Sequence, residues 1–476
     1  MEERTDYFSE DENDALRRYL EIPDKQKPGY FDVYEFELII DYFLDRHDFK
    51  SAGEVIDYAL KLHPNTMILL QKKAQLFISE GFHYKALNIL KNIQFIETSN
   101  SYIFFLMGIA YSSLGEISKA ISNFDKSMEL GPEEKEEYLV NAGTTLEQIG
   151  HYDLAIRYFK KLLEENESNA IALYEMAFCC EKLNYDKQSI EFYKLYLFED
   201  PYSRLAWTNL ASVYYKIEEY EKSIEAIEFA IVIDPEYSFS YFQKGLSEIF
   251  DEKYVDGIES LKYFLISEPN DPEAHFYLGE AYAKLDKNRD AIKHFEKTVH
   301  IDTSHADAYY GLAFVYYIQG KYSNAFNSIS KALNIDSGES DFWHLSALIN
   351  QKLGNFEGSE QAFRKGITLD HSDPQIWIDY SELETGKKSI NRKIKILSQA
   401  FEHFSEDAEI NYRLAANLAL AHNTETAVFH LDKALKAEPS KLEIFRKIYA
   451  DKNSVIEQII DQHLYDYYNS GLKDIH

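Results

Sequence analysis

The sequence predicts an all-α fold of about twelve helix-turn-helix repeats, with capping helices at the ends of the repeat array. The first observation is the spacing of rare residues, which recur at multiples of 34 in Trp207, Trp343 and Trp377. Pro201, Pro235 and Pro269 give the same spacing independently, because they follow one another at intervals of 34 residues. The third observation is that 476 residues include only 10 prolines and 19 glycines, which favours long helices with few interruptions.

A 34-residue frame covers residues 33–441 in twelve repeats, with one residue inserted near Lys135. The repeats are 33–66, 67–100, 101–134, 136–169, 170–203, 204–237, 238–271, 272–305, 306–339, 340–373, 374–407 and 408–441. Counted from the first residue of each repeat, columns eight and twenty hold small residues and column twenty-four is always apolar, with Ile40 and Lys393 as the exceptions. Because helices approach closely only at small side chains, each repeat is expected to fold as a helical pair.

The two ends of the chain lie outside this frame. Residues 1–32 are expected to form an acidic leader, unstructured over 1–14, followed by a short N-terminal cap from residue 15. A competing interpretation makes the leader a competitor for a basic partner. Residues 442–476 are predicted to form C-terminal capping helices, from apolar residues at helical spacing: Val455, Ile456, Ile459, Ile460, Leu464, Tyr467 and Tyr468. The alternative for this segment is a self-association helix.

The repeat resembles the tetratricopeptide repeat family. The closest match is the repeat 272–305, which has Leu278, Gly279, Tyr282, Ala291 and Phe295 at the family's positions. The resemblance implies antiparallel helix pairs wound into a right-handed superhelix, with the first helix of each pair lining a concave groove. It implies that columns two, five, nine, twelve and thirteen face the groove. The cations of the family's carboxylate clamp are missing around Asn141 and Asn209, so binding of acidic chaperone tails is not expected.

The charge and the motifs restrict the function. With 50 basic and 81 acidic residues the net charge is −31, which opposes nucleic-acid binding and an anionic membrane surface as partners. No stretch is long enough to insert in a membrane, and the few cysteines, Cys179 and Cys180, fit the cytoplasm. We find no catalytic, cofactor or metal motif, and we interpret His294, His300 and His305 as surface residues. The chain is therefore expected not to be an enzyme.

The groove columns of repeats seven to nine, with a smaller group in repeat three, are unusually apolar. The candidate partner-binding residues are Phe239, Phe242, Leu246, Ile249, Phe250, Phe276, Tyr277, Tyr310, Phe314, Tyr317, Tyr102 and Phe105. An exposed patch of this kind predicts a scaffold or adaptor that binds an apolar peptide or helix, possibly with basic character, within a multi-subunit assembly. The competing structural interpretations are that these residues pack against other turns, or that the assigned groove face is shifted by one column.

Two other functions are kept as alternatives. The chain could be a self-associating structural subunit, paired as a homo-oligomer through its C-terminal helix. It could also be the regulatory subunit of an enzyme on another chain. A basic cluster, which could dock an acidic partner or the chain's own N-terminal leader, or form a solvated surface, consists of Lys387, Lys388, Arg392, Lys393 and Lys395.

Overall fold

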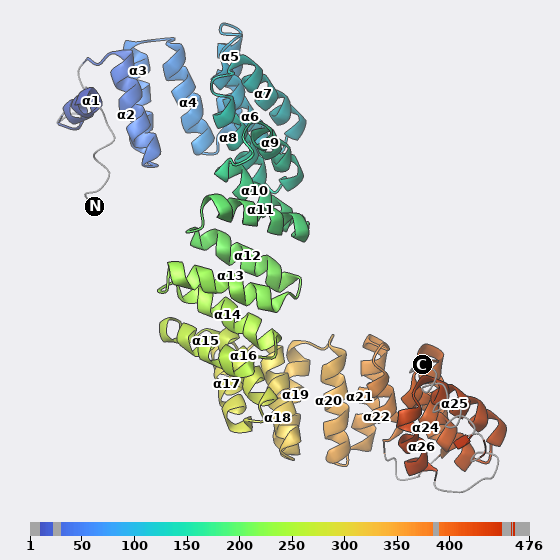
Figure 1. Ribbon diagram of the computed structural model, residues 1–476. Helices are drawn as coiled ribbons and strands as arrows, with labels where there is room; N and C mark the ends of the chain where they lie inside the picture. The colour runs from blue at the N-terminus through green and yellow to red at the C-terminus, as the bar shows by residue number, and fades with distance from the viewer. Residues whose placement is uncertain (1–9, 22–29, 384–389, 450–457, 459, 462–476) are drawn as a thin grey trace. The chain divides into compact units, whose positions relative to one another are not determined.

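The computed structural model describes residues 10–21, 30–383, 390–449, 458, 460 and 461. Within these residues the chain is helical and contains no strand. It divides into two compact units, an N-terminal array (Met1–Tyr237) and a C-terminal array (Ser238–His476). The repeats lie in both arrays as antiparallel helix pairs, so the fold is the predicted all-α repeat solenoid (Figure 1).

The N-terminal array contains one preceding helix and six helix pairs. Its helices are α1 (Glu10–Leu20), α2 (Val33–Asp45), α3 (Phe49–Leu62), α4 (Met67–Ser79), α5 (His83–Gln94), α6 (Ser101–Ser113), α7 (Ile117–Leu130), α8 (Lys135–Gln148), α9 (Tyr152–Glu165), α10 (Ala170–Lys182), α11 (Asp186–Glu199), α12 (Arg204–Lys216) and α13 (Tyr220–Ile233). Helix α1 begins before residue 15, so part of the expected unstructured leader is helical. The additional residue Lys135 begins α8, which has 14 residues where α6 and α10 have 13.

The C-terminal array contains six further pairs and two short terminal helices. Its helices are α14 (Ser238–Phe250), α15 (Tyr254–Ser267), α16 (Pro272–Lys284), α17 (Asn288–Ile301), α18 (Ala306–Ile318), α19 (Tyr322–Ile335), α20 (Ser340–Lys352), α21 (Phe356–Leu369), α22 (Pro374–Ser381), α23 (Ile390–His403), α24 (Ala408–Leu420), α25 (Thr424–Ala437), the 3₁₀ helix η1 (Pro439–Lys441) and α26 (Leu442–Ile448). Of the apolar residues predicted in the cap beyond residue 450, Ile460 is buried against this array, and the others lie outside the described residues.

Helix starts and turns follow from local chemistry. Asp32, Asn169 and Asp271 each accept a backbone N–H three residues on, which satisfies a donor at the start of a first helix. Between the two helices of a repeat, column fifteen has positive φ wherever it is described. The residues there are His47, Gly81, Gly115, Gly150, Asn184, Glu218, Glu252, Asp286, Gly320, Gly354 and His422. Such a residue ends one helix and reverses the chain.

The core of each repeat is a large side chain placed over a small one. Column twenty-four is at most 1% exposed in every repeat: Ile56, Leu90, Phe124, Phe159, Tyr193, Ile227, Leu261, Phe295, Ile329, Phe363, Leu397 and Leu431. A Cβ atom on Gly279 would lie only 2.6 Å from the Phe295 ring. Serines in column twenty bond across the crossing, as where Ser189 Oγ donates to the carbonyl of Ala177 at 2.8 Å. The two small columns therefore mark the close contact of the pair.

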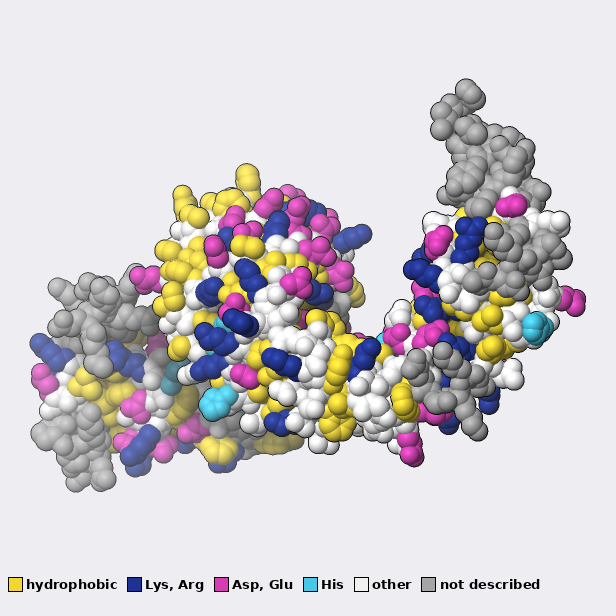
Figure 2. All heavy atoms as spheres, turned by 90° about the horizontal axis from the view of Figure 1, so that it is seen from below, with side chains coloured by type: hydrophobic (Ala, Val, Ile, Leu, Met, Phe, Trp, Pro, Cys, Tyr) yellow, Lys and Arg dark blue, Asp and Glu magenta, His cyan; other side chains and the backbone are white. Residues whose placement is uncertain are grey.

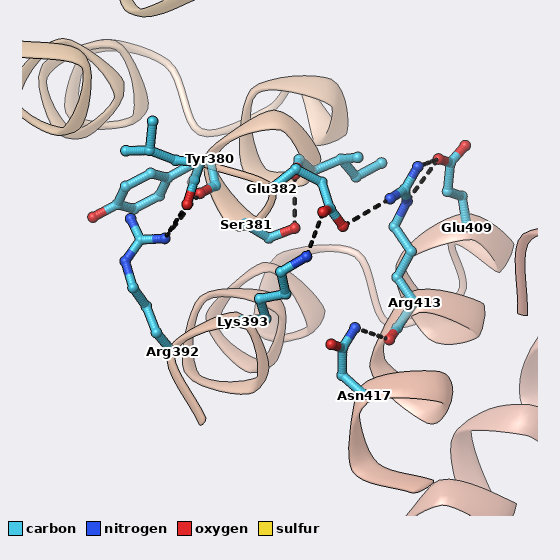
Figure 3. A network of polar contacts seen from close by, with 10 residues as sticks. Tyr380, Ser381, Glu382, Arg392, Lys393, Glu409, Arg413 and Asn417 are labelled. Carbon is cyan, nitrogen blue, oxygen red and sulfur yellow. Dashed lines mark hydrogen bonds and ion pairs between the residues drawn. The ribbon is translucent and has the colours of Figure 1, made fainter. Parts of the chain in front are cut away.

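Repeat eleven departs from this pattern because Lys393 occupies its small-residue column. The lysine forms an ion pair with Glu382, just beyond the short helix α22. Glu382 also contacts Arg413 of α24 at 3.1 Å, and Arg413 contacts Glu409 at 2.8 Å (Figure 3). The charge thus joins α23 to α22 and α24 where other repeats place a small residue.

The predicted basic cluster is divided by these contacts. Arg392 donates to the backbone carbonyls of Tyr380 and Leu383 at 3.5 and 3.4 Å (Figure 3). Lys395 is exposed, whereas Lys387 and Lys388 lie outside the described residues. Arg392 and Lys393 therefore serve the packing of repeat eleven.

Candidate functional site

The first helices of the repeats form the inner face of each array. In the C-terminal array α16 contacts both α14 and α18, and α18 contacts α20, although a second helix lies between them in sequence. Contacts between successive second helices are fewer. The first helices are therefore closer together than the second helices, and their free side is the concave one.

The predicted groove residues on α14, α16 and α18 have graded exposure. Phe239, Phe250 and Phe314 are 43%, 44% and 42% exposed. The half-buried members of the set are Phe242, Leu246, Phe276, Tyr277, Tyr310 and Tyr317. Three large rings that a partner could cover thus lie on the first helices of repeats seven and nine.

The half-buried rings are held by neighbouring helices. The ring of Phe242 lies 5.0 Å from that of Phe264 on α15. The Tyr310 ring stacks at 5.1 Å on Phe342 of α20, the first helix of the next repeat. These rings form a fixed floor, because moving them would break packing within and between repeats.

Two of the predicted groove residues, Ile249 and Phe105, are core residues, which corrects the expectation for them. Ile249 is 8% exposed, and its side chain fills the space above Gly257, so column twelve of repeat seven faces inward. Phe105 is 6% exposed and stacks on Tyr138 of α8 at 4.9 Å. A first helix contacts both its own second helix and the next repeat, so its buried arc is wider than the assumed columns allow.

Tyr102, the other predicted residue of repeat three, is half-buried and stacks at 6.1 Å on Phe105. Burial, with the nearby charge of Asp41, raises the pKa of Tyr102 to about 12. This smaller group belongs to the N-terminal array and is mainly a packing contact between α6 and α8.

A row of carboxylates runs along the groove of the C-terminal array. Column two holds Glu273, Asp307 and Asp341 on α16, α18 and α20, and all three are exposed. Burial first, and then the charges of Asp341 and Glu280, raise the pKa of Tyr310 to about 12. Burial also raises the pKa of the Glu280 carboxyl group, with Lys284 opposing the rise. The carboxylates thus lie on first helices beside the exposed Phe314, whereas α14 carries no member of this acidic row.

This acidic row was not predicted from the sequence, because only the apolar residues of the groove columns were considered there. The signal was present, since Glu273, Asp307 and Asp341 recur at intervals of 34 residues. On the face drawn in Figure 2, hydrophobic side chains lie in patches among positive and negative ones, so charge alone does not mark a site.

The histidines and cysteines singled out in the sequence have structural environments. His294 Nδ1 lies 3.0 Å from His275 Nδ1, and burial lowers the pKa of His294 to about 4. His305 accepts the Ala308 N–H at the start of α18. Cys179 and Cys180 are buried, and burial raises the pKa of the Cys180 thiol to about 11, which opposes thiolate chemistry.

Sequence comparison with known families gives matches across much of the chain. Models of the tetratricopeptide repeat match residues 140–204, 205–237 and 242–304. The chain is a tetratricopeptide repeat protein. A further model, described as anaphase-promoting complex, cyclosome, subunit 3, matches residues 284–366 of this tetratricopeptide repeat array. Comparison with curated proteins finds no match.

Solved structures with similar folds include other tetratricopeptide repeat proteins. Yeast Tom70 is 13% identical, with 90% of this chain and 96% of that chain covered and a TM-score of 0.41. PilW, titled a widely conserved type IV pilus biogenesis factor, is 17% identical over 45% of this chain and 98% of that chain, with a TM-score of 0.41. YrrB, titled a TPR protein with an unusual peptide-binding site, is 18% identical over 40% and 98%, with a TM-score of 0.33.

Among the described residues, no helix combines the length and apolar character needed to cross a membrane.

Proposed function

We propose that this tetratricopeptide repeat protein is a non-enzymatic adaptor. Its groove on α14, α16 and α18 binds a helical or extended protein segment that carries both apolar and basic side chains. The observation that carries the proposal is the combination of three exposed phenylalanines on α14 and α18, Phe239, Phe250 and Phe314, with the acidic row on α16, α18 and α20.

The two features would contribute differently to binding. Each phenylalanine is more than two-fifths exposed, and covering such rings supplies most of the favourable free energy at a protein interface. The carboxylates remain solvated, so their main effect is to accelerate encounter with a basic segment and to select against an acidic one. A partner with both kinds of residue therefore fits better than a purely apolar one.

A peptide library displayed on phage and selected on the full-length protein would test the groove. Enriched sequences are expected to combine Leu, Phe or Ile with Lys or Arg. Replacing Phe250→Asp together with Phe314→Asp should weaken their binding roughly tenfold or more, because both anchors are lost and the acidic groove gains charge. Affinities would be measured by fluorescence anisotropy of the synthesised peptides.

Phe326→Asp is the matched control, because Phe326 is 38% exposed and lies on the second helix α19, away from the groove. Circular dichroism would establish that each variant keeps its helical content. If the selected peptides bind the double variant and the control equally well, the groove proposal is wrong.

The rest of the functional interpretation stays a prediction. Ile460 is buried within the array, which supports a capping role for the C-terminal segment. This burial is an argument against the alternative that the segment mediates self-association. Light scattering of the full chain would decide between a homo-oligomer and a monomer. A regulatory role toward an enzyme on another chain remains an alternative, and the buried thiols suit the cytoplasm.

A further inference from the structure

The outer surface of the N-terminal array carries an apolar stripe on its last two second helices. In α11 and α13, columns twenty-two, twenty-six and twenty-nine hold one glutamate and two apolar residues. This outer stripe consists of Glu191, Leu195, Phe198, Glu225, Phe229 and Val232. Its apolar members are 52%, 84%, 54% and 80% exposed, in chain order. They share one helix face, because positions three and four apart lie above one another.

Every other repeat except repeat seven places a charged or polar residue in at least one of columns twenty-six and twenty-nine. Column twenty-six is lysine in half of the repeats: Lys126, Lys161, Lys297, Lys331, Lys365 and Lys433. Several of these lysines make polar contacts, as where Lys297 donates to Asn270 at 3.0 Å. Repeats five, six and seven alone are apolar at both columns twenty-six and twenty-nine, and α15 carries the third copy as Glu259, Tyr263 and Ile266.

The core of these repeats is filled by residues outside the stripe. Column twenty-four already supplies the core of these repeats through Tyr193 and Ile227, both fully buried. Phe229 stacks on Trp207 at 4.5 Å with nearly parallel rings, which holds the phenylalanine on the surface in one orientation. A row of exposed apolar side chains that recurs in register is typical of an interaction surface, whereas isolated ones are ordinary.

A hollow beside Leu195 extends this surface toward α9 and α10. Its apolar lining is Leu163, Leu173, Phe192 and Leu195, and its rim includes the carboxylates of Glu165 and Glu167. Lys135 forms an ion pair with Glu165. The hollow could receive an apolar side chain while a basic side chain of the same partner meets the rim.

The charges around the stripe select the occupant. On α11 and α13 five exposed glutamates outnumber three exposed lysines: Glu191, Glu199, Glu221, Glu225 and Glu228 against Lys187, Lys194 and Lys222. Glu191 and Glu225 lie one helical turn before the apolar pairs on the same face. A second copy of this chain, at a net charge of −31, would bring further negative charge to this surface.

We propose that the outer stripe is a second docking site, distinct from the groove, for an amphipathic helix of another protein. The helix places its apolar side chains over Leu195, Phe198, Phe229 and Val232. Its lysines or arginines face Glu191 and Glu225. The protein can then hold two partners at once, one on first helices and one on second helices.

The same displayed peptide library, selected on the full-length protein, tests this site. One class of enriched peptides should show apolar residues at helical spacing beside Lys or Arg. For that class, Phe198→Glu with Val232→Glu should weaken binding at least tenfold, and Glu191→Lys with Glu225→Lys should do the same. Both apolar side chains project into solvent, and repeats three and four already carry Glu129 and Glu164 at this column.

Phe95→Glu is the matched control, because Phe95 occupies column twenty-nine of repeat two and is 86% exposed. It should leave the affinity within about twofold, as should the groove variant Phe250→Asp with Phe314→Asp. If no enriched peptide distinguishes the stripe variant from the Phe95 control, the proposal is overturned, whatever the result for the groove.

Two further measurements exclude other occupants. Light scattering that shows a dimer abolished by Phe198→Glu with Val232→Glu would assign the stripe to a second copy and contradict the proposal. Sedimentation with phosphatidylglycerol vesicles that depends on the same residues would assign it to a membrane surface, with the same consequence.

Discussion

Glu147 of α8 and Glu175 of α10 are neighbouring carboxyl groups whose pKa values are higher than in water. Burial, followed by hydrogen bonding to Glu175 and repulsion from its charge, raises the pKa of Glu147 to about 8. Burial also raises the pKa of Glu175. Two neighbouring carboxyl groups cannot both ionise at low cost, so the folded protein retains a proton there that the unfolded chain releases.

The carboxyl pair should make stability depend on pH in a defined direction. A carboxyl group whose pKa is raised by folding stabilises the protein below its unfolded pKa of about 4.5, and this contribution is lost as the pH rises to about 8. Glu147→Gln removes the ionisation. We expect the free energy of unfolding of the variant, relative to that of the wild type, to rise by about 1 kcal/mol over this pH range, after allowance for the partial exposure of Glu147. Urea unfolding at several pH values measures the difference.

Glu133→Gln is the control for this prediction, because Glu133 is exposed in the loop before α8. The difference in free energy of unfolding between this variant and the wild type should stay constant over the same pH range. A flat difference for Glu147→Gln as well would show that the pair does not share a proton.

At the scale of the element, the packing of a repeat depends on the combined size of the side chains in columns eight and twenty-four. Phenylalanine in column twenty-four meets glycine in column eight at Gly108, Gly143 and Gly279, where an added Cβ would lie 2.4–2.6 Å from the ring. Leucine or isoleucine there meets alanine in repeats two, six, nine and twelve. Repeats five and ten combine alanine with Tyr193 and Phe363, and repeat seven combines glycine with Leu261, so the pairing is a preference with exceptions.

Gly279→Ala should destabilise the C-terminal array by about 1–3 kcal/mol, because the methyl group displaces the Phe295 ring in a filled core. Combining it with Phe295→Leu should cost less than the two single changes added together. Thermal and urea unfolding of the single and double variants measures this coupling.

Gly53→Ala provides the opposite case in α3. A Cβ there meets only Leu76 at an ordinary 3.5 Å, so the helix propensity of alanine should stabilise the protein by up to about 1 kcal/mol.

Additive effects of Gly279→Ala and Phe295→Leu would contradict the proposed dependence on the combined size of the two side chains.

At the scale of the whole molecule, the excess of 81 acidic over 50 basic residues opposes the folded state. Many surface ion pairs are present, such as Lys216 with Asp186 at 2.6 Å, but each exposed pair contributes little. Repulsion among the remaining carboxylates acts over longer distances and therefore responds to salt.

We expect the melting temperature to rise as NaCl increases from roughly 10 mM to roughly 150 mM, because the screening length falls from about 30 Å to about 8 Å. Differential scanning calorimetry would measure it, with equal osmolality of sucrose as the control for non-ionic effects. A fall in melting temperature would mean that the ion pairs outweigh the repulsion.

The 34-residue repeat and its core can be derived from the amino-acid sequence. The periodicity of Trp207, Pro235 and the small columns follows from packing that each helix pair must satisfy locally. It is therefore visible in one amino-acid sequence. Phe239, Phe250 and Phe314 lie on exposed first-helix surface, and their role in binding stays a prediction. The sequence could not identify Ile249 and Phe105 as buried, because burial depends on how the next helix packs.

Which residues share a surface depends on how the helix pairs stack on one another. The acidic row and the outer stripe each join side chains 34 residues apart, and only the stacking of helix pairs brings such positions into one row. The pKa of Glu147 likewise depends on Glu175 from the next repeat. Local patterns specify the helices, whereas potential, exposure and desolvation arise from neighbours that are distant in the chain.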